Sequence, residues 1–120
     1  MRQSRFDLLH GLRRRRLDAC RMQLAAVRRF GDELESRLSE TVQVSGSVIE
    51  EQRSAIGPGD LVVERLADCR RRRRELQQVE RMLARRRDLI DEVTDLARSN
   101  LEEAVRQVEV IEKLVEKVSG

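Results

Sequence analysis

Residues 97–115 read ARSNLEEAVRQVEVIEKLV, and their apolar side chains recur at alternating steps of four and three residues. This spacing places an apolar stripe along one side of an α-helix and is typical of coiled coils. Followed in both directions, it selects seventeen positions between Val62 and Val118, of which thirteen are apolar. The pattern predicts one long helix over residues 60–119. Its stripe includes Leu76, Leu83, Ile90, Ala97, Leu101, Val108 and Ile111.

A second stripe of the same spacing precedes the first. It selects fifteen positions between Phe6 and Ala55, of which nine are apolar. We therefore predict another long helix over residues 4–56. The pattern is weakest over residues 41–47, where Gly46 leaves open a break in this helix. The apolar members of the stripe include Cys20, Leu24, Val27, Leu34 and Leu38.

The two predicted helices are separated by Gly57-Pro58-Gly59. Proline and glycine end a helix and turn the chain, and Asp60 is a suitable N-cap for the helix that follows. We therefore predict an all-α fold, with two long helices forming an antiparallel coiled-coil hairpin, as a single domain over residues 1–120. If the chain folds at Pro58, the numbers of facing residues sum to about 117. Cys20 would then face Ala97.

The charges fall into four blocks that support antiparallel pairing. Residues 1–30 have a net charge of +7, residues 31–64 of −6, residues 65–87 of +7 and residues 88–120 of −5. An antiparallel hairpin places the first block along the fourth and the second along the third, so that opposite signs face each other. A parallel self-dimer in register would instead place +7 against +7, which disfavours that arrangement.

The composition points to long helices rather than to a thick core. Charged residues make up 39% of the chain, and it has no Trp and no Tyr. No run of eighteen apolar residues is present, so we expect no membrane span, and the Arg-rich start lacks the apolar segment of a secretory signal. Cys20 and Cys69 both lie on the stripes, where we expect them to be small buried hydrophobic residues.

Catalysis has little support in the sequence. His10 is the only histidine, and no residue at metal-ligand spacing or with a catalytic partner's chemistry accompanies it. The glycines around Pro58 lack the Lys and Ser/Thr of a phosphate-binding loop. We therefore expect no enzyme activity, no metal, no cofactor and no small-molecule substrate.

Three arginine runs are the most conspicuous feature: Arg13–Arg16, Arg70–Arg74 and Arg85–Arg87. One interpretation is electrostatic support of the acidic residues on the opposite helix. Another is protein binding, because consecutive helical residues point in all directions and arginine binds carboxylates through two parallel hydrogen bonds. On the seam, Arg13, Arg73 and Arg87 can cover apolar surface with their aliphatic stems.

Two other functions stay open. The chain fits a generic coiled-coil scaffold or dimerisation protein. The run Arg70–Arg74 also precedes a seven-residue apolar repeat, as in a basic-zipper nucleic-acid binder. That run is short and has no Asn or Gln to read base edges, so nucleic-acid binding is the less favoured of the two.

Both ends of the chain resemble a known family. Residues 5–19, RFDLLHGLRRRRLDA, are similar to the opening of the FliJ proteins, which begin with an aromatic residue, a Leu-Leu step, basic residues and a long helix. Residues 104–114, AVRQVEVIEKL, resemble the Glu-Lys-Leu pattern near the end of that family's second helix. The resemblance covers both termini and the two-helix layout, whereas the tip around Pro58 matches no motif of the family, whose members are usually longer.

The resemblance implies a role in flagellar protein export, or in the related injectisome. FliJ proteins are small cytoplasmic coiled-coil stalks of type III secretion that also bind export chaperones. The end that bears both termini inserts into the hexameric export ATPase, and the remainder reaches toward the membrane protein of the export gate, at the inner membrane. Carried over to this chain, the resemblance assigns ATPase contacts to Phe6, Arg13, Arg14, Arg15, Arg16, Glu109, Glu112 and Lys113.

Overall fold

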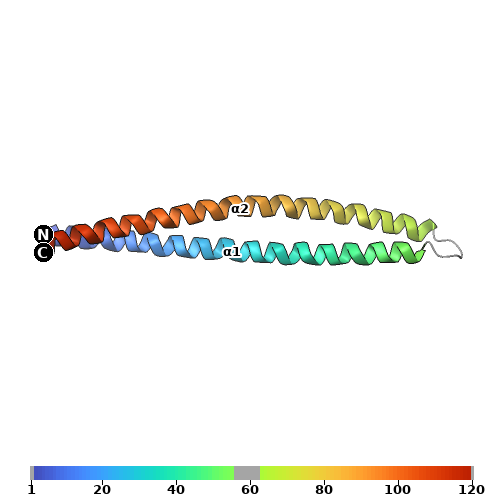
Figure 1. The fold of residues 1–120 in the computed structure, drawn as a ribbon, viewed down its shortest axis with the longest axis horizontal. Helices are drawn as coiled ribbons and strands as arrows, with labels where there is room; N and C mark the ends of the chain where they lie inside the picture. The colour runs from blue at the N-terminus through green and yellow to red at the C-terminus, as the bar shows by residue number, and fades with distance from the viewer. Residues whose placement is uncertain (1, 56–62, 120) are drawn as a thin grey trace. The chain divides into compact units, whose positions relative to one another are not determined.

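The structure, a computed structural model, describes the backbone of residues 2–55 and 63–119 and the side chains of residues 5–54 and 63–119. It contains two helices, α1 (Arg2–Ala55) and α2 (Val63–Ser119) (Figure 1). The predicted all-α class with two long helices is confirmed. Helix α1 begins two residues before the predicted start. The predicted turn at Gly57-Pro58-Gly59, the predicted cap at Asp60 and the seam position Val62 lie outside the described residues.

Helix α1 continues through Gly46 without a break. The polar residues on either side keep their hydrogen bonds within the helix: the Thr41 hydroxyl donates to the Arg37 carbonyl at 2.8 Å, and the Ser47 hydroxyl donates to the Gln43 carbonyl at 3.2 Å. These bonds satisfy the two hydroxyls within the helix.

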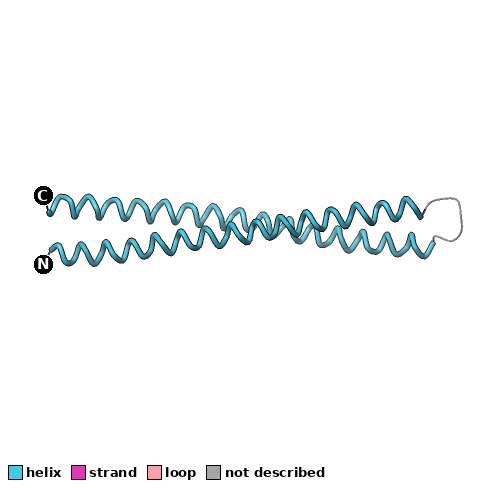
Figure 2. Tube along the Cα trace, turned by 90° about the horizontal axis from the view of Figure 1, so that it is seen from below, coloured by secondary structure: helices cyan, strands magenta, loops and turns pink. Residues whose placement is uncertain are grey.

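The helices contribute to two compact units. Unit 1 consists of Met1–Phe30 and Ile90–Gly120, and unit 2 of Gly31–Leu89. Within unit 1 the early turns of α1 lie beside the late turns of α2, as both views show (Figures 1 and 2). The segments run in opposite directions, because His10 contacts Glu112 whereas the later residue Arg16 contacts the earlier residue Gln107.

Unit 1 has a thin apolar core along its seam. Leu17 and Cys20 of α1 form a buried cluster with Ala104 and Val108 of α2. Two of the four are small, so the helices approach closely while burying little apolar surface. The other buried residues of unit 1 are Leu24, Ala97 and Ile111.

The segments of unit 2 also run in opposite directions. Ser45 contacts Glu80 at 2.8 Å, and the later residue Glu51 contacts the earlier residue Arg72 at 2.8 Å. The buried residues here are Leu34, Val48, Cys69 and Leu83. All the buried residues of both units therefore belong to the predicted stripes.

The predicted register is wrong by one heptad. The contacts of unit 1 pair residue 10 with 112 and 16 with 107, sums of 122 and 123. Those of unit 2 pair 45 with 80 and 51 with 72, sums of 125 and 123. Cys20 accordingly clusters with Ala104 and not with the predicted Ala97. A slip of seven residues keeps every seam residue on the seam, so the spacing alone does not select the partner.

Candidate protein-binding surface

The residues assigned to partner binding by resemblance lie in unit 1, on the early turns of α1 and the late turns of α2. Phe6 is half-buried, whereas Glu109, Glu112 and Lys113 are exposed. His10 Nε2 lies 3.2 Å from Glu112 Oε1. These two residues line a shallow hollow of about 210 Å³ with Val115, Glu116 and Ser119.

The run Arg13–Arg16 divides into two kinds of side chain. Arg13 is half-buried and donates a hydrogen bond to the carbonyl oxygen of Gln107 at 2.9 Å, and Arg16 donates to Oε1 of the same residue at 2.7 Å. Arg14 and Arg15 are exposed, and no carboxylate of the described residues pairs with them. Their guanidinium groups thus remain available to a partner.

Gln107 was missed by the sequence reasoning. It holds two arginines of α1 through its main-chain and side-chain oxygens, and so fixes where the run lies against α2. It precedes the seam residue Val108, a position next to the helix contact. With the predicted register Gln107 would have faced His10, so its position beside the seam could not have linked it to the arginine run.

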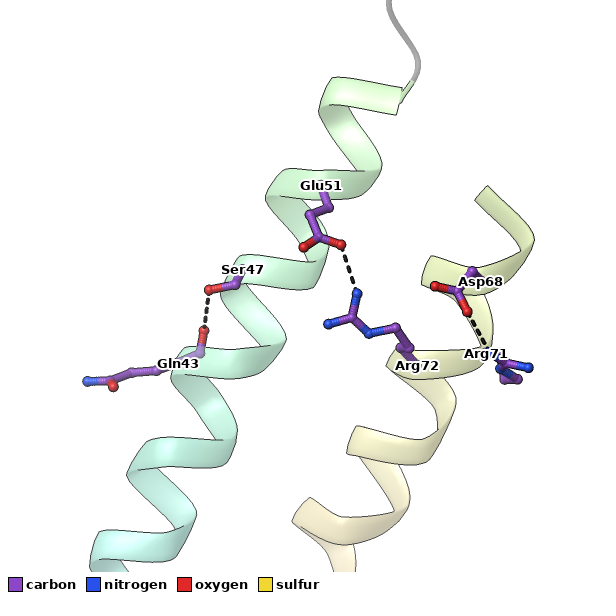
Figure 3. A network of polar contacts seen from close by, with 6 residues as sticks. All are labelled: Gln43, Ser47, Glu51, Asp68, Arg71 and Arg72. Carbon is purple, nitrogen blue, oxygen red and sulfur yellow. Dashed lines mark hydrogen bonds and ion pairs between the residues drawn. The ribbon is translucent and has the colours of Figure 1, made fainter. Parts of the chain in front are cut away.

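Some arginines of unit 2 are engaged as well. Figure 3 shows the ion pair from Arg72 to Glu51 on the opposite helix and that from Arg71 to Asp68 within α2. Arg73 donates to Gln52 Oε1 at 3.1 Å, and Arg87 lies 3.9 Å from Glu35. The electrostatic interpretation therefore applies to Arg71–Arg73 and Arg87, whereas Arg70, Arg74 and Arg86 are exposed without a carboxylate partner among the described residues, like Arg14 and Arg15.

The predicted seam arginines all reach the opposite helix. Arg13, Arg73 and Arg87 are half-buried, and each contacts a polar group across the seam. The predicted apolar seam residues are buried or half-buried as well. Cys20, Leu24, Leu34, Leu83, Ala97, Val108 and Ile111 are buried, and Val27, Leu38, Leu76, Ile90 and Leu101 are half-buried.

Three other features bear on chemistry. Both cysteines are free and buried. Within residues 5–54 and 63–119, no group of three or more His, Cys, Asp or Glu is placed to hold a metal ion. None of the helical segments that the structure describes is long and apolar enough to cross a bilayer.

No family model matches this sequence, and no curated protein or solved structure is significantly similar to it.

Proposed function

We propose that this chain is a coiled-coil stalk and chaperone-binding component of a type III protein export apparatus, in which unit 1 engages the export ATPase ring. The observation that carries the proposal is the exposed pair Arg14 and Arg15, which have no carboxylate partner among the described residues. The resemblance of residues 5–19 and 104–114 to FliJ proteins names the partner.

The chemistry of the contact follows from the arginine side chain. A guanidinium binds a carboxylate through two parallel hydrogen bonds, so the pair fits acidic residues on the inner surface of an ATPase ring. Arg13 and Arg16 are held by Gln107, which keeps the first turns of α1 against α2 while Arg14 and Arg15 point away. In this proposal the helix pair couples the ATPase ring to the membrane protein of the export gate.

The test is reconstitution with the cognate export ATPase. The wild-type chain is expected to co-purify with the ATPase and to raise its turnover, and the double variant Arg14→Glu/Arg15→Glu is expected to lose both effects. The matched control is Arg28→Glu/Arg29→Glu, which reverses two exposed arginines two heptads later at equivalent helix positions. The proposal fails if the wild-type chain neither binds the ATPase nor changes its turnover.

The alternative of a generic scaffold gives a different result in the same experiment. A scaffold without an export role leaves ATPase turnover unchanged, and deletion of its gene leaves secretion and motility intact. Equal loss of binding in the control would assign the effect to net charge rather than to Arg14 and Arg15.

A further inference from the structure

One side of unit 1 is apolar and uncovered. It is formed by residues that immediately precede a seam residue in either helix, and we call it the lateral face. From α1 it includes Leu9, Leu12 and Phe30, which are 36%, 52% and 62% exposed. From α2 it includes Val93, Leu96, Val110 and Leu114, which are 45%, 62%, 53% and 41% exposed.

Two observations place the contributions of both helices on the same side. Arg16 and Gln107 each precede a seam residue, and they are joined by a hydrogen bond of 2.7 Å. A groove of about 300 Å³ lies farther along, lined by Gln23, Ala26 and Val27 of α1 and by Val93, Leu96, Ala97 and Asn100 of α2. The face is therefore continuous across the helix pair. Apolar residues lie toward both ends, Arg16, Gln23, Asn100, Glu103 and Gln107 lie between them, and Arg5 and Lys117 lie at the end near the termini.

The opposite side of unit 1 has a different character. The residues that immediately follow seam residues are mostly charged and exposed there, among them Arg14, Arg21, Arg28, Asp91 and Glu109. In unit 2, positions equivalent to those of the lateral face hold the ion pair of Glu51 with Arg72, and also the exposed apolar residues Val44, Val79, Met82 and Leu89. Exposed apolar side chains thus occur at these positions in both units, whereas the opposite side of unit 1 is charged, and solvation does not explain the apolar side.

We propose that the lateral face binds a second copy of this chain, so that two copies of unit 1 form a four-helix bundle. The core of unit 1 consists largely of one seam, and its central cluster contains only Leu17, Cys20, Ala104 and Val108. Packing two lateral faces together converts this seam into a core of four helices, the arrangement in which amphipathic helices with wide apolar faces are stable.

Charge selects the second copy and its orientation. The α1 part of unit 1 belongs to a block with a net charge of +7, and the α2 part to a block with −5. A two-fold axis parallel to the helices places α1 of each copy against α2 of the other, so opposite charges meet twice. A two-fold axis perpendicular to the helices places +7 against +7.

The same orientation gives the central polar residues a partner. Arg16 of one copy lies level with the partner's α2 turn that contains Glu103 and Gln107. Arg16 and Glu103 both precede seam residues and are exposed in the single chain. Because the axis relates the copies, the pair occurs twice, and it makes the centre of the face complementary to itself.

Sedimentation of the full chain from low to high micromolar concentration tests the proposal. The wild type is expected to show a reversible monomer–dimer equilibrium. Phe30→Glu and Leu96→Glu each place a charge within the apolar face, and each is expected to raise the dissociation constant at least about tenfold. The matched control is Met22→Glu, since Met22 is 72% exposed on the same helix but lies off the lateral face; it is expected to leave the constant unchanged.

A charge exchange separates assembly from folding. Arg16→Glu alone is expected to weaken the dimer by like-charge repulsion against Glu103 of the other copy, and Arg16→Glu/Glu103→Arg is expected to restore it. Helicity by circular dichroism is measured on every variant. A wild-type chain that stays monomeric, a folded Leu96→Glu variant that still dimerises normally, or a charge exchange that fails to restore assembly would each overturn the proposal.

The dimer is a state of the free chain and does not rest on the export role. The variants for ATPase binding change Arg14 and Arg15, neither of which belongs to the lateral face. If the chain dimerises but does not bind the ATPase, only the proposed function is contradicted. If it binds the ATPase but stays monomeric, only the proposed dimer is contradicted.

Discussion

The Ser45 hydroxyl donates a hydrogen bond to Glu80 Oε1 at 2.8 Å, and both residues occupy seam positions of unit 2. A second polar layer follows, in which Arg73 donates to Gln52. In unit 1, hydrogen bonds of His10 and Arg13 also cross the seam, but buried seam residues such as Leu17 and Val108 face one another as well. The seam of unit 2 is therefore held partly by hydrogen bonds, whose net contribution to stability is small.

The first prediction concerns that polar layer. Ser45→Ala/Glu80→Leu replaces both hydrogen-bonding partners with apolar groups, so no buried polar atom is left unpaired. We expect the free energy of unfolding to rise by about 1–2 kcal/mol. Urea denaturation followed by circular dichroism measures it. The control Glu75→Leu makes the same exchange at an exposed position outside the seam and should change stability by less than about 0.5 kcal/mol. A less stable double variant would contradict the prediction.

A second prediction concerns the apolar seam of unit 1. Ile111 is 1% exposed, and Ile111→Ala removes apolar contacts and leaves a cavity. We expect a loss of about 2–4 kcal/mol in the free energy of unfolding. Leu8→Ala removes the same number of carbons from a side chain that is 68% exposed, and it should cost much less. Thermal and urea unfolding provide the comparison, and equal losses would show that Ile111 is not packed as the structure has it.

The two buried thiols report on local opening. Cys20 is 7% exposed in unit 1 and Cys69 is 4% exposed in unit 2. Exposure alone predicts the slower reaction for Cys69, but the polar layers of unit 2 predict easier opening and thus a faster reaction. We expect easier opening to outweigh the lower exposure, so that Cys69 reacts faster than Cys20. The test measures the rate at which a thiol reagent modifies the single-thiol variants Cys69→Ala and Cys20→Ala in native buffer. A faster reaction of Cys20 than of Cys69 would contradict the prediction, because it would mean that unit 1 opens more easily than unit 2.

The sequence predicts which residues form the seam, as two buried seam residues illustrate. Val48 and Ile111 are nearly or wholly inaccessible, and both follow from steps of three and four residues, which any long two-helix pair must satisfy. The lateral face was not predicted. Leu96 and Val110 each immediately precede a seam residue. In the sequence they look like isolated apolar residues beside the main stripe. In the structure they belong to a second apolar stripe on one side of unit 1.

The spacing of apolar residues does not determine the register of the two helices, and the last prediction tests that register. Cys20 lies in one buried cluster with Ala104, whereas folding at Pro58 would pair it with Ala97. In a Cys69→Ala background, Ala104→Cys is therefore expected to form a disulfide with Cys20 within the chain, and Ala97→Cys is not, because a disulfide requires Cα atoms within about 7 Å of each other. Both alanines are buried seam residues, 1% and 7% exposed, so the two variants differ in register and little else. Peptide mass spectrometry under non-reducing conditions identifies the bond.

A disulfide from Cys20 to position 97 in place of 104 would contradict the prediction and would move every contact between the helices by one heptad. Arg16 would then lie seven residues from Gln107, and the arginine run would lose the residue that holds it.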